Sequence, residues 1–204
     1  MTERASTRLY RILFGLTGLI AVAYQFYARS QINPFNPVNY FSYFTILSNI
    51  LIFSLFLLGG ISNRVSSSVV YEKWRGAAVV YMLVTGLIYF VLLRGLEESL
   101  QTPIPWVNTI LHYVMPLAAI IDWMMDRPRV KLRVSIVWTW FMFPAVYLVY
   151  SLVRGQITAF YPYPFLNLDT QGLSTVLMMS GVIVLVFSSL SLFVIWIGNK
   201  RERT

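Results

Sequence analysis

The chain contains no cysteine and only one histidine, and these scarcities exclude several kinds of site. Without cysteine there are no disulfides, no thiolate metal ligands and no cysteine nucleophile. A single histidine excludes bis-histidine haem ligation and disfavours a zinc site, so we expect no metal and no cofactor. Charged residues are also few, at 12% of the chain.

Apolar residues dominate instead: 57% of the 204 residues are hydrophobic and 16% are aromatic. A soluble domain of this length could not bury so much apolar surface, so the composition predicts an all-α integral membrane protein. The formal net charge is +8, but the basic residues lie between the apolar runs. We therefore expect contact with bilayer lipids rather than with nucleic acid.

Six apolar runs are long enough to be membrane spans. A helix needs about 20 mostly apolar residues to cross the hydrocarbon core. The runs cover residues 9–27, 41–60, 74–93, 106–125, 132–152 and 173–198. Because most links between them are short, the sequence predicts one six-helix transmembrane domain over residues 1–204.

Basic residues are distributed unequally between the two ends of these spans. The end that holds both termini carries Arg4, Arg8, Arg11, Arg64, Lys73, Arg75, Arg127, Arg129, Lys131, Arg133, Lys200, Arg201 and Arg203. The other end carries only Arg29, Arg94 and Arg154. The positive-inside rule therefore places both termini in the cytoplasm. A cleaved signal peptide is the alternative for the first span, but its apolar run continues through Tyr27.

Polar side chains at membrane depth are costly, so each is a candidate for function. The segment "NYFSYFTILSNILIF" (residues 39–53) carries Ser42, Thr45 and Asn49, which would share one helix face. The fourth span carries Asn108 and His112 on another face. At 1.5 Å rise per residue, Thr45 and His112 would lie about 6 and 9 Å below the outer boundary. The two polar stripes could therefore meet inside the bundle.

A threonine and a histidine at similar depth suggest nucleophilic catalysis. Neutral imidazole is the side chain best suited to remove a hydroxyl proton near neutral pH, so Thr45 and His112 would form a catalytic dyad. The oxyanion formed on attack needs donors, and Asn49, Asn108 and Ser42 are candidates for that role or for substrate positioning, with tyrosine hydroxyls as others. The alternative is that these groups only join helices through hydrogen bonds.

Two further residues of the fourth span have structural interpretations. Pro116 cannot donate a backbone hydrogen bond to residue 112, which predicts a kink or an opened turn at His112. Proline is also tolerated generally in membrane helices. Asp122 would lie roughly 15 Å deeper than His112, near Arg127 and Arg129. We interpret it as a structural ion-pair residue.

Arg94 and one loop complete the set of candidates. Arg94, at the outer end of the third span, could bind a fatty-acid carboxylate or extend to the membrane interface. The segment "FYPYPFLNLDTQG" (residues 160–172) is too rich in proline for a helix. It is either a plain connector with aromatic anchors or a cap over the bundle.

The words "FSYFTILSNIL", "LHYVMPLAAIIDW" and "YPYPFLNLD" together resemble the prokaryotic six-helix branch of the androgen-induced protein family. The resemblance covers nearly the whole chain. It implies an intramembrane threonine hydrolase of fatty acid esters of hydroxy fatty acids. The family's threonine matches Thr45 and its histidine matches His112, the same pair that the spacing indicates.

The sequence thus predicts a lipid esterase in a prokaryotic cytoplasmic membrane, with a long-chain ester as substrate. The loop with repeated Tyr-Pro pairs departs from the animal members, which leaves another acyl ester open as the substrate. The alternative function is that of a non-catalytic lipid-binding or scaffolding membrane protein.

Overall fold

A computed structural model describes residues 2–96 and 104–200, with side chains from Ala5 onward, and every regular element in that part is helical. Six helices are long and apolar enough to cross a membrane. They cover Ala5–Ser30, Phe44–Ile61, Val69–Leu93, Pro105–Met125, Ile136–Thr158 and Leu168–Asn199. The expected all-helical architecture with six spans is confirmed.

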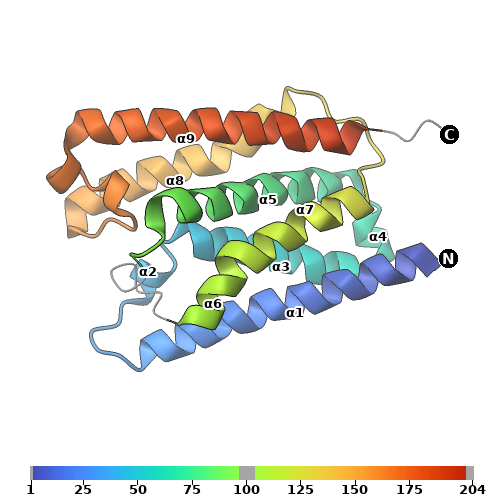
Figure 1. Ribbon diagram of the computed structural model, residues 1–204, viewed down its shortest axis with the longest axis horizontal. Helices are drawn as coiled ribbons and strands as arrows, with labels where there is room; N and C mark the ends of the chain where they lie inside the picture. The colour runs from blue at the N-terminus through green and yellow to red at the C-terminus, as the bar shows by residue number, and fades with distance from the viewer. Residues whose placement is uncertain (1, 97–103, 201–204) are drawn as a thin grey trace.

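Helices run along a common long axis, and α1 begins at the same end of the bundle at which α9 finishes (Figure 1). In chain order the elements are α1 (Thr2–Ser30), α2 (Pro37–Tyr40), α3 (Phe44–Ile61), α4 (Asn63–Ser66), α5 (Val69–Ile88), the π-helix η1 (Tyr89–Leu93), α6 (Pro105–Thr109), the π-helix η2 (Ile110–Val114), α7 (Met115–Met125), α8 (Ile136–Thr158), the 3₁₀ helix η3 (Pro164–Leu166) and α9 (Leu168–Asn199). Orientation across the membrane stays a prediction. Of the arginines used for it, Arg201, Arg203 and the side chain of Arg4 lie outside the described residues.

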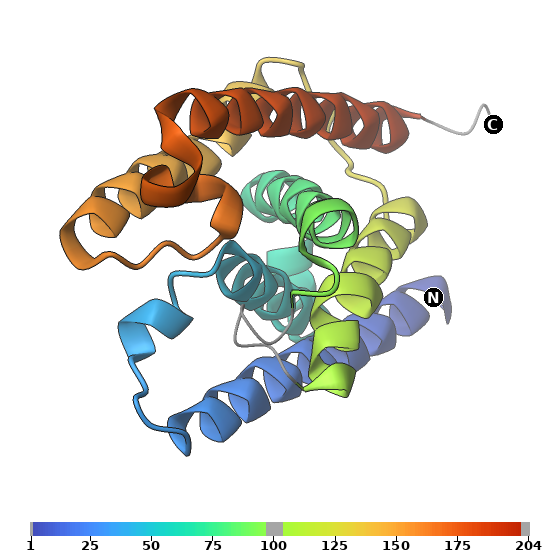
Figure 2. The same ribbon diagram turned by 60° about the vertical axis from the view of Figure 1, so that its left-hand side comes forward.

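The third span, α5 continued by η1, lies in the middle of the bundle, with the other helices around it (Figure 2). The fraction of buried residues is larger in this span than in the other five, and it is smallest in α8. Small residues allow close packing elsewhere: a Cβ at Gly60 of α3 would lie 3.0 Å from the Arg8 carbonyl oxygen of α1. Membrane helices commonly approach one another through such residues, because lipid supplies no hydrophobic drive for association.

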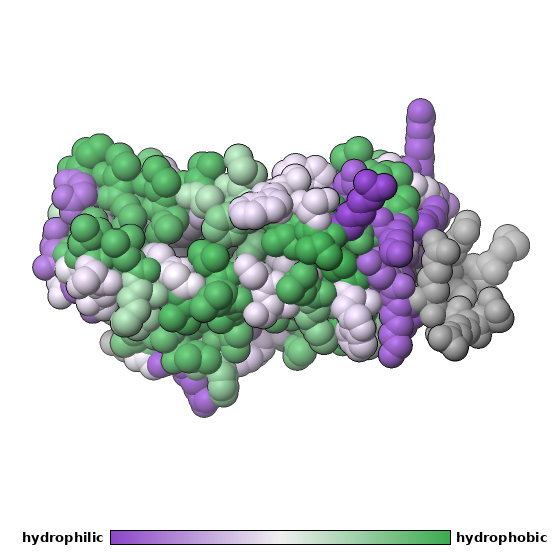
Figure 3. All heavy atoms as spheres, turned by 90° about the horizontal axis from the view of Figure 1, so that it is seen from above, coloured by the Kyte–Doolittle hydropathy of each residue, from purple (hydrophilic) through white to green (hydrophobic). Residues whose placement is uncertain are grey.

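Apolar residues cover most of the lateral surface, and hydrophilic residues gather toward its ends (Figure 3). Large side chains such as Trp138, Ile157 and Leu185 are exposed on α8 and α9. An apolar surface of this extent would be unfavourable in water and suits contact with lipid chains.

Two expected spans begin later in the structure than in the sequence analysis. The second begins at Phe44 rather than at residue 41, because α2 ends at Tyr40 and three residues separate it from α3. The fifth begins at Ile136 rather than at residue 132. Asn199 of α9 holds both the N–H and the carbonyl of Leu132, at 2.9 and 2.8 Å, and so keeps that residue in the link.

Candidate functional site

Thr45 and His112 lie side by side inside the bundle. Thr45 Oγ1 is 3.3 Å from His112 Nε2, and the two residues are 7% and 4% exposed. Thr45 is the second residue of α3, and His112 is the middle residue of η2. The structure therefore brings the two sequence candidates within hydrogen-bonding distance, and a catalytic role for them stays a prediction.

The backbone fixes the protonation pattern of the imidazole. His112 Nδ1 lies 3.1 Å from the carbonyl oxygen of Asn108, which can only accept a hydrogen bond. Nδ1 must therefore be the donor. In the neutral ring this leaves the lone pair on Nε2 directed at the Thr45 hydroxyl, which is the arrangement that a general base requires.

Tyr163 contacts Thr45 from the loop between α8 and α9. Its hydroxyl accepts a hydrogen bond from the Thr45 N–H at 3.2 Å and lies 3.3 Å from Thr45 Oγ1. Burial raises the pKa of Tyr163, so the phenol stays protonated near neutral pH. Because Thr45 lies at the N-terminus of α3, the helix dipole also favours negative charge developing on its oxygen.

The π-helix η2 gives His112 its position. Residues of a π-helix form a wider turn than those of an α-helix, and such turns are frequent at functional sites. Pro116 follows one turn later, so the opened turn expected at His112 is present. Gly86 of α5 packs against this turn, since a Cβ there would lie 3.1 Å from the His112 carbonyl oxygen.

Tyr89 and Asn108 hold the imidazole from two sides. The Tyr89 ring stacks on His112 with 4.0 Å between centroids and an angle of 21°. Asn108 Nδ2 donates a hydrogen bond to the Tyr89 hydroxyl, and the backbone carbonyl of Asn108 accepts one from His112 Nδ1. Asn108 thus restrains both rings, and this contact favours a positioning role over that of an oxyanion donor.

Asn49 ties α3 to the π-helix beside the dyad. Its amide donates to the Thr45 carbonyl at 2.9 Å and to the Leu111 carbonyl at 3.2 Å. Both amide protons are therefore engaged with backbone oxygens. Asn49 is completely buried and lies one helical turn below Thr45. This geometry assigns Asn49 to holding the two helices together rather than to binding an oxyanion.

Ser42 and Arg94 lie apart from the dyad. Because α3 begins after Ser42, the expected stripe through this residue is wrong. Its hydroxyl donates to the Val38 carbonyl at 2.6 Å and lies 2.8 Å from the Tyr150 hydroxyl. Arg94 is exposed, and its guanidinium lies 5.8 Å from the centre of the Phe90 ring instead of lining the cavities beside Thr45.

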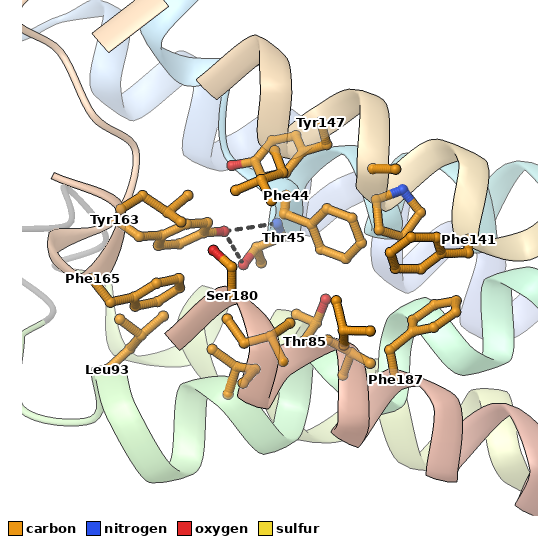
Figure 4. A pocket seen from close by; sticks show the side chains of 18 residues that line it. Phe44, Thr45, Thr85, Leu93, Phe141, Tyr147, Tyr163, Phe165, Ser180 and Phe187 are labelled. Atoms are coloured by element: carbon orange, nitrogen blue, oxygen red, sulfur yellow. Dashed lines mark hydrogen bonds between the residues drawn. The ribbon is translucent and has the colours of Figure 1, made fainter. Parts of the chain in front are cut away.

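Thr45 lines two cavities. The larger, of about 110 Å³, is lined by apolar residues of α3, α5, α8 and α9 and by the loop that carries Tyr163. Figure 4 shows the Tyr163 hydroxyl directed at Thr45, and Phe44, Phe141, Phe165, Phe187 and Leu93 also line this cavity. The smaller cavity has a volume of about 20 Å³. Polar and apolar residues from α1, the α2 region and the fourth span line it, and His112 is one of them.

Asp122 belongs to a separate buried ion-pair cluster. Arg11 Nε lies 2.6 Å from one of its carboxylate oxygens and Arg75 Nη1 lies 2.8 Å from the other. Asp122 is thus a structural ion-pair residue, as expected, and its partners are Arg11 and Arg75 of other helices. Within the described residues, no group of three or more histidine, aspartate or glutamate side chains is arranged to hold a metal ion.

Sequence reasoning missed Tyr163 and Tyr89 as individual members of the site. The repeated Tyr-Pro pairs of residues 161–164 were a signal for Tyr163, because proline interrupts the helix after α8 and lets the chain fold back. The expectation of no helix over residues 160–172 is wrong in part, since Pro164–Leu166 form η3 and α9 begins at Leu168 rather than at residue 173. Tyr163 and Leu166 are buried, so this loop is a cap over the bundle rather than a plain connector. No periodicity distinguishes Tyr89 from the other aromatic residues of its span.

No protein-family model, curated protein or solved structure shows significant similarity to this chain.

Proposed function

We propose that this chain is an intramembrane lipid esterase in which Thr45 is the nucleophile and His112 is the general base. The observation that carries the proposal is the 3.3 Å contact between Thr45 Oγ1 and the lone-pair nitrogen of His112, beside an apolar cavity. The sequence resemblance to the androgen-induced family of threonine hydrolases supports the same pair.

The reaction would follow two steps. Thr45 Oγ1 attacks the ester carbonyl carbon while His112 Nε2 accepts the hydroxyl proton. The tetrahedral intermediate collapses, the bond to the alcohol oxygen breaks, and His112 returns the proton to that leaving oxygen. Water then attacks acyl-Thr45 with His112 again as base, which releases the fatty acid and restores the threonine.

Tyr163 is the best candidate for the oxyanion donor. The negative charge on the carbonyl oxygen needs a fixed donor in a water-poor site. The Tyr163 hydroxyl lies 3.3 Å from the attacking oxygen, and its burial keeps it protonated. When substrate binds, its proton can turn from Thr45 Oγ1 to the substrate oxygen.

The shape and chemistry of the larger cavity support a long-chain acyl ester as substrate. Its lining includes Phe44, Phe141, Phe187 and Leu148, and its polar groups are few. An acyl chain in this space would leave one apolar medium for another, so little desolvation would oppose binding. Fatty acid esters of hydroxy fatty acids, the substrates that the resemblance implies, fit this class, as do other long-chain esters.

Active-site labelling with a fluorophosphonate tests the proposal. Thr45→Val and Thr85→Val form a matched pair, because both remove a hydroxyl from a buried threonine that lines the same cavity. We expect the wild type and Thr85→Val to be labelled, and Thr45→Val and His112→Ala to be unlabelled, at unchanged elution volumes. Equal labelling of all four proteins would refute the dyad.

Hydrolysis is tested with purified protein and a panel of long-chain lipid esters, with the released fatty acids measured by mass spectrometry. The proposal expects release by the wild type and a fall of at least about 10³-fold in Thr45→Val, because residues that act as one catalytic unit have effects of this size. Lipid that copurifies with the wild type but is neither cleaved nor bound covalently would instead support the lipid-binding alternative.

A further inference from the structure

The smaller cavity differs from the larger one in the groups that surround it. Thr45 and Tyr163 border both cavities, but His112 borders only the smaller. Gln25 and Tyr40 approach it from α1 and α2. The residue that would act as base thus borders a second, smaller space, distinct from the space that suits an acyl chain.

The volume of this cavity suits one small molecule. Its volume is about 20 Å³. A space of about 10–15 Å³ on this scale holds a single water, provided that two or more polar groups surround it. The larger cavity would be filled by the acyl chain during turnover, so the smaller one is the space beside the dyad that stays open to a second reactant.

Gln25 supplies a buried acceptor at this cavity. The residue is 3% exposed, and its Oε1 has no hydrogen-bond partner among the described residues. Buried acceptors without a partner are unfavourable, and in native proteins water usually satisfies them. Once Thr45 is acylated, its hydroxyl no longer donates to His112 Nε2. Gln25 Oε1 and His112 Nε2 are then two acceptors beside one cavity, and water has two protons to donate.

We propose that the smaller cavity is the binding site of the hydrolytic water and that Gln25 is the residue that positions it. This inference rests on the proposed esterase function. In deacylation one water proton passes to His112 Nε2 while the other stays in a hydrogen bond to Gln25 Oε1. The water oxygen bonds to the acyl carbon, the bond from that carbon to Thr45 Oγ1 breaks, and His112 returns the proton to Thr45.

Gln25→Met tests this assignment, because it keeps the length of the side chain and removes the acceptor. With 4-nitrophenyl decanoate, nitrophenol release reports acylation in a first burst and deacylation in the steady state. We expect Gln25→Met to release about one equivalent of nitrophenol in the burst and then to turn over about ten-fold more slowly than the wild type. Acyl-Thr45 should be visible in its intact mass spectrum. The ten-fold loss corresponds to one hydrogen bond.

Two variants serve as controls. Ser191→Ala also removes a buried oxygen that has no partner among the described residues, but on α9 and outside this cavity, and should behave as the wild type. Gln25→Glu keeps an acceptor oxygen and should restore much of the steady-state rate. A purely structural role of Gln25 would lower burst and steady state together and would not favour the acylated form.

The outcomes separate the inference from the function on which it rests. Wild-type turnover with acyl-Thr45 formed, and no effect of Gln25→Met on deacylation, would overturn the water site alone. No release of nitrophenol and no acyl adduct in the wild type would overturn both proposals. If Gln25→Met does not fold, a crystal structure of the wild type at a resolution that orders water decides: the site predicts a water in the smaller cavity within hydrogen-bonding distance of Gln25 Oε1, and its lack refutes the site.

Discussion

The backbone N–H of Thr45 donates to the hydroxyl oxygen of Tyr163, and the hydroxyl oxygens of the two residues lie 3.3 Å apart. This contact joins the N-terminus of α3 to a loop that begins more than a hundred residues later in the chain. Phe165 stacks on the Tyr163 ring with 5.3 Å between centroids, and this contact restrains the position of the phenol. The cap over the bundle therefore also completes the polar part of the candidate site.

Tyr163→Phe should lower kcat for ester hydrolysis while changing KM little. Loss of one oxyanion donor costs on the order of 10²-fold in kcat, because the donor acts mainly in the transition state. Tyr161→Phe in the same loop is the control, since the Tyr161 hydroxyl contacts Gln156 and not Thr45. Steady-state kinetics measures kcat for both variants. Equal kcat values for Tyr163→Phe and Tyr161→Phe would contradict the assignment of Tyr163 as the oxyanion donor.

The sequence predicted the parts of the fold and site that depend on local composition. Six apolar runs predict six helices, and the spacing of Thr45 and His112 along two of them predicts similar depth. Neither helix faces nor loop paths follow from composition. The position of Tyr163 therefore required the structure, as did the discovery that both amide protons of Asn49 are engaged with backbone oxygens.

The same limit applies to the charged residues. The sequence predicts Arg11 and Arg75 as flanking residues at the ends of their spans, because arginine usually marks the interface. In the structure both are nearly completely buried and bind Asp122 from α1 and α5. A pattern along one helix does not show that two other helices supply opposite charges at the same level.

Asp122→Ala should destabilise the protein strongly. Removing this carboxylate leaves the buried Arg75 guanidinium with no carboxylate partner among the described residues and leaves Arg11 with only the partly exposed carboxylate of Asp126, and breaking a buried pair costs about 3–5 kcal/mol. Thermal unfolding in detergent measures the effect, with Asp169→Ala, an exposed acidic residue of α9, as the control. Equal melting temperatures for the two variants would show that the cluster contributes little to stability.

Alkaline pH should destabilise the protein partly through Tyr43, which precedes α3. Burial, reinforced by Tyr163 and opposed by Arg29, raises the pKa of Tyr43 from 10.0 to about 12. The folded state thus holds this proton more tightly than the unfolded state. Its contribution to stability is complete below about pH 10 and is lost as the pH rises through about 12.

The Tyr43→Phe variant isolates this effect. We expect its melting temperature to fall less than that of the wild type between about pH 9 and pH 12, because the variant has no phenol to ionise at this position. Tyr27→Phe on α1 removes an exposed phenol and is the matched control. If the melting temperature of Tyr43→Phe fell with pH as steeply as that of the wild type, the prediction would be contradicted.

Filling the larger cavity should change which acyl chains the protein accepts. Ala145 of α8 lines this cavity, so Ala145→Phe would occupy space that a long chain needs while leaving the dyad unchanged. One methylene more or less in an apolar pocket changes kcat/KM by about ten-fold or more, so long-chain esters should lose at least that much relative to short ones. Competition between esters of two chain lengths, with released acids measured by mass spectrometry, gives the ratio directly. Ala23→Phe adds the same ring at an exposed position of α1 and should keep the wild-type ratio; an unchanged ratio in Ala145→Phe would mean that the acyl chain binds elsewhere.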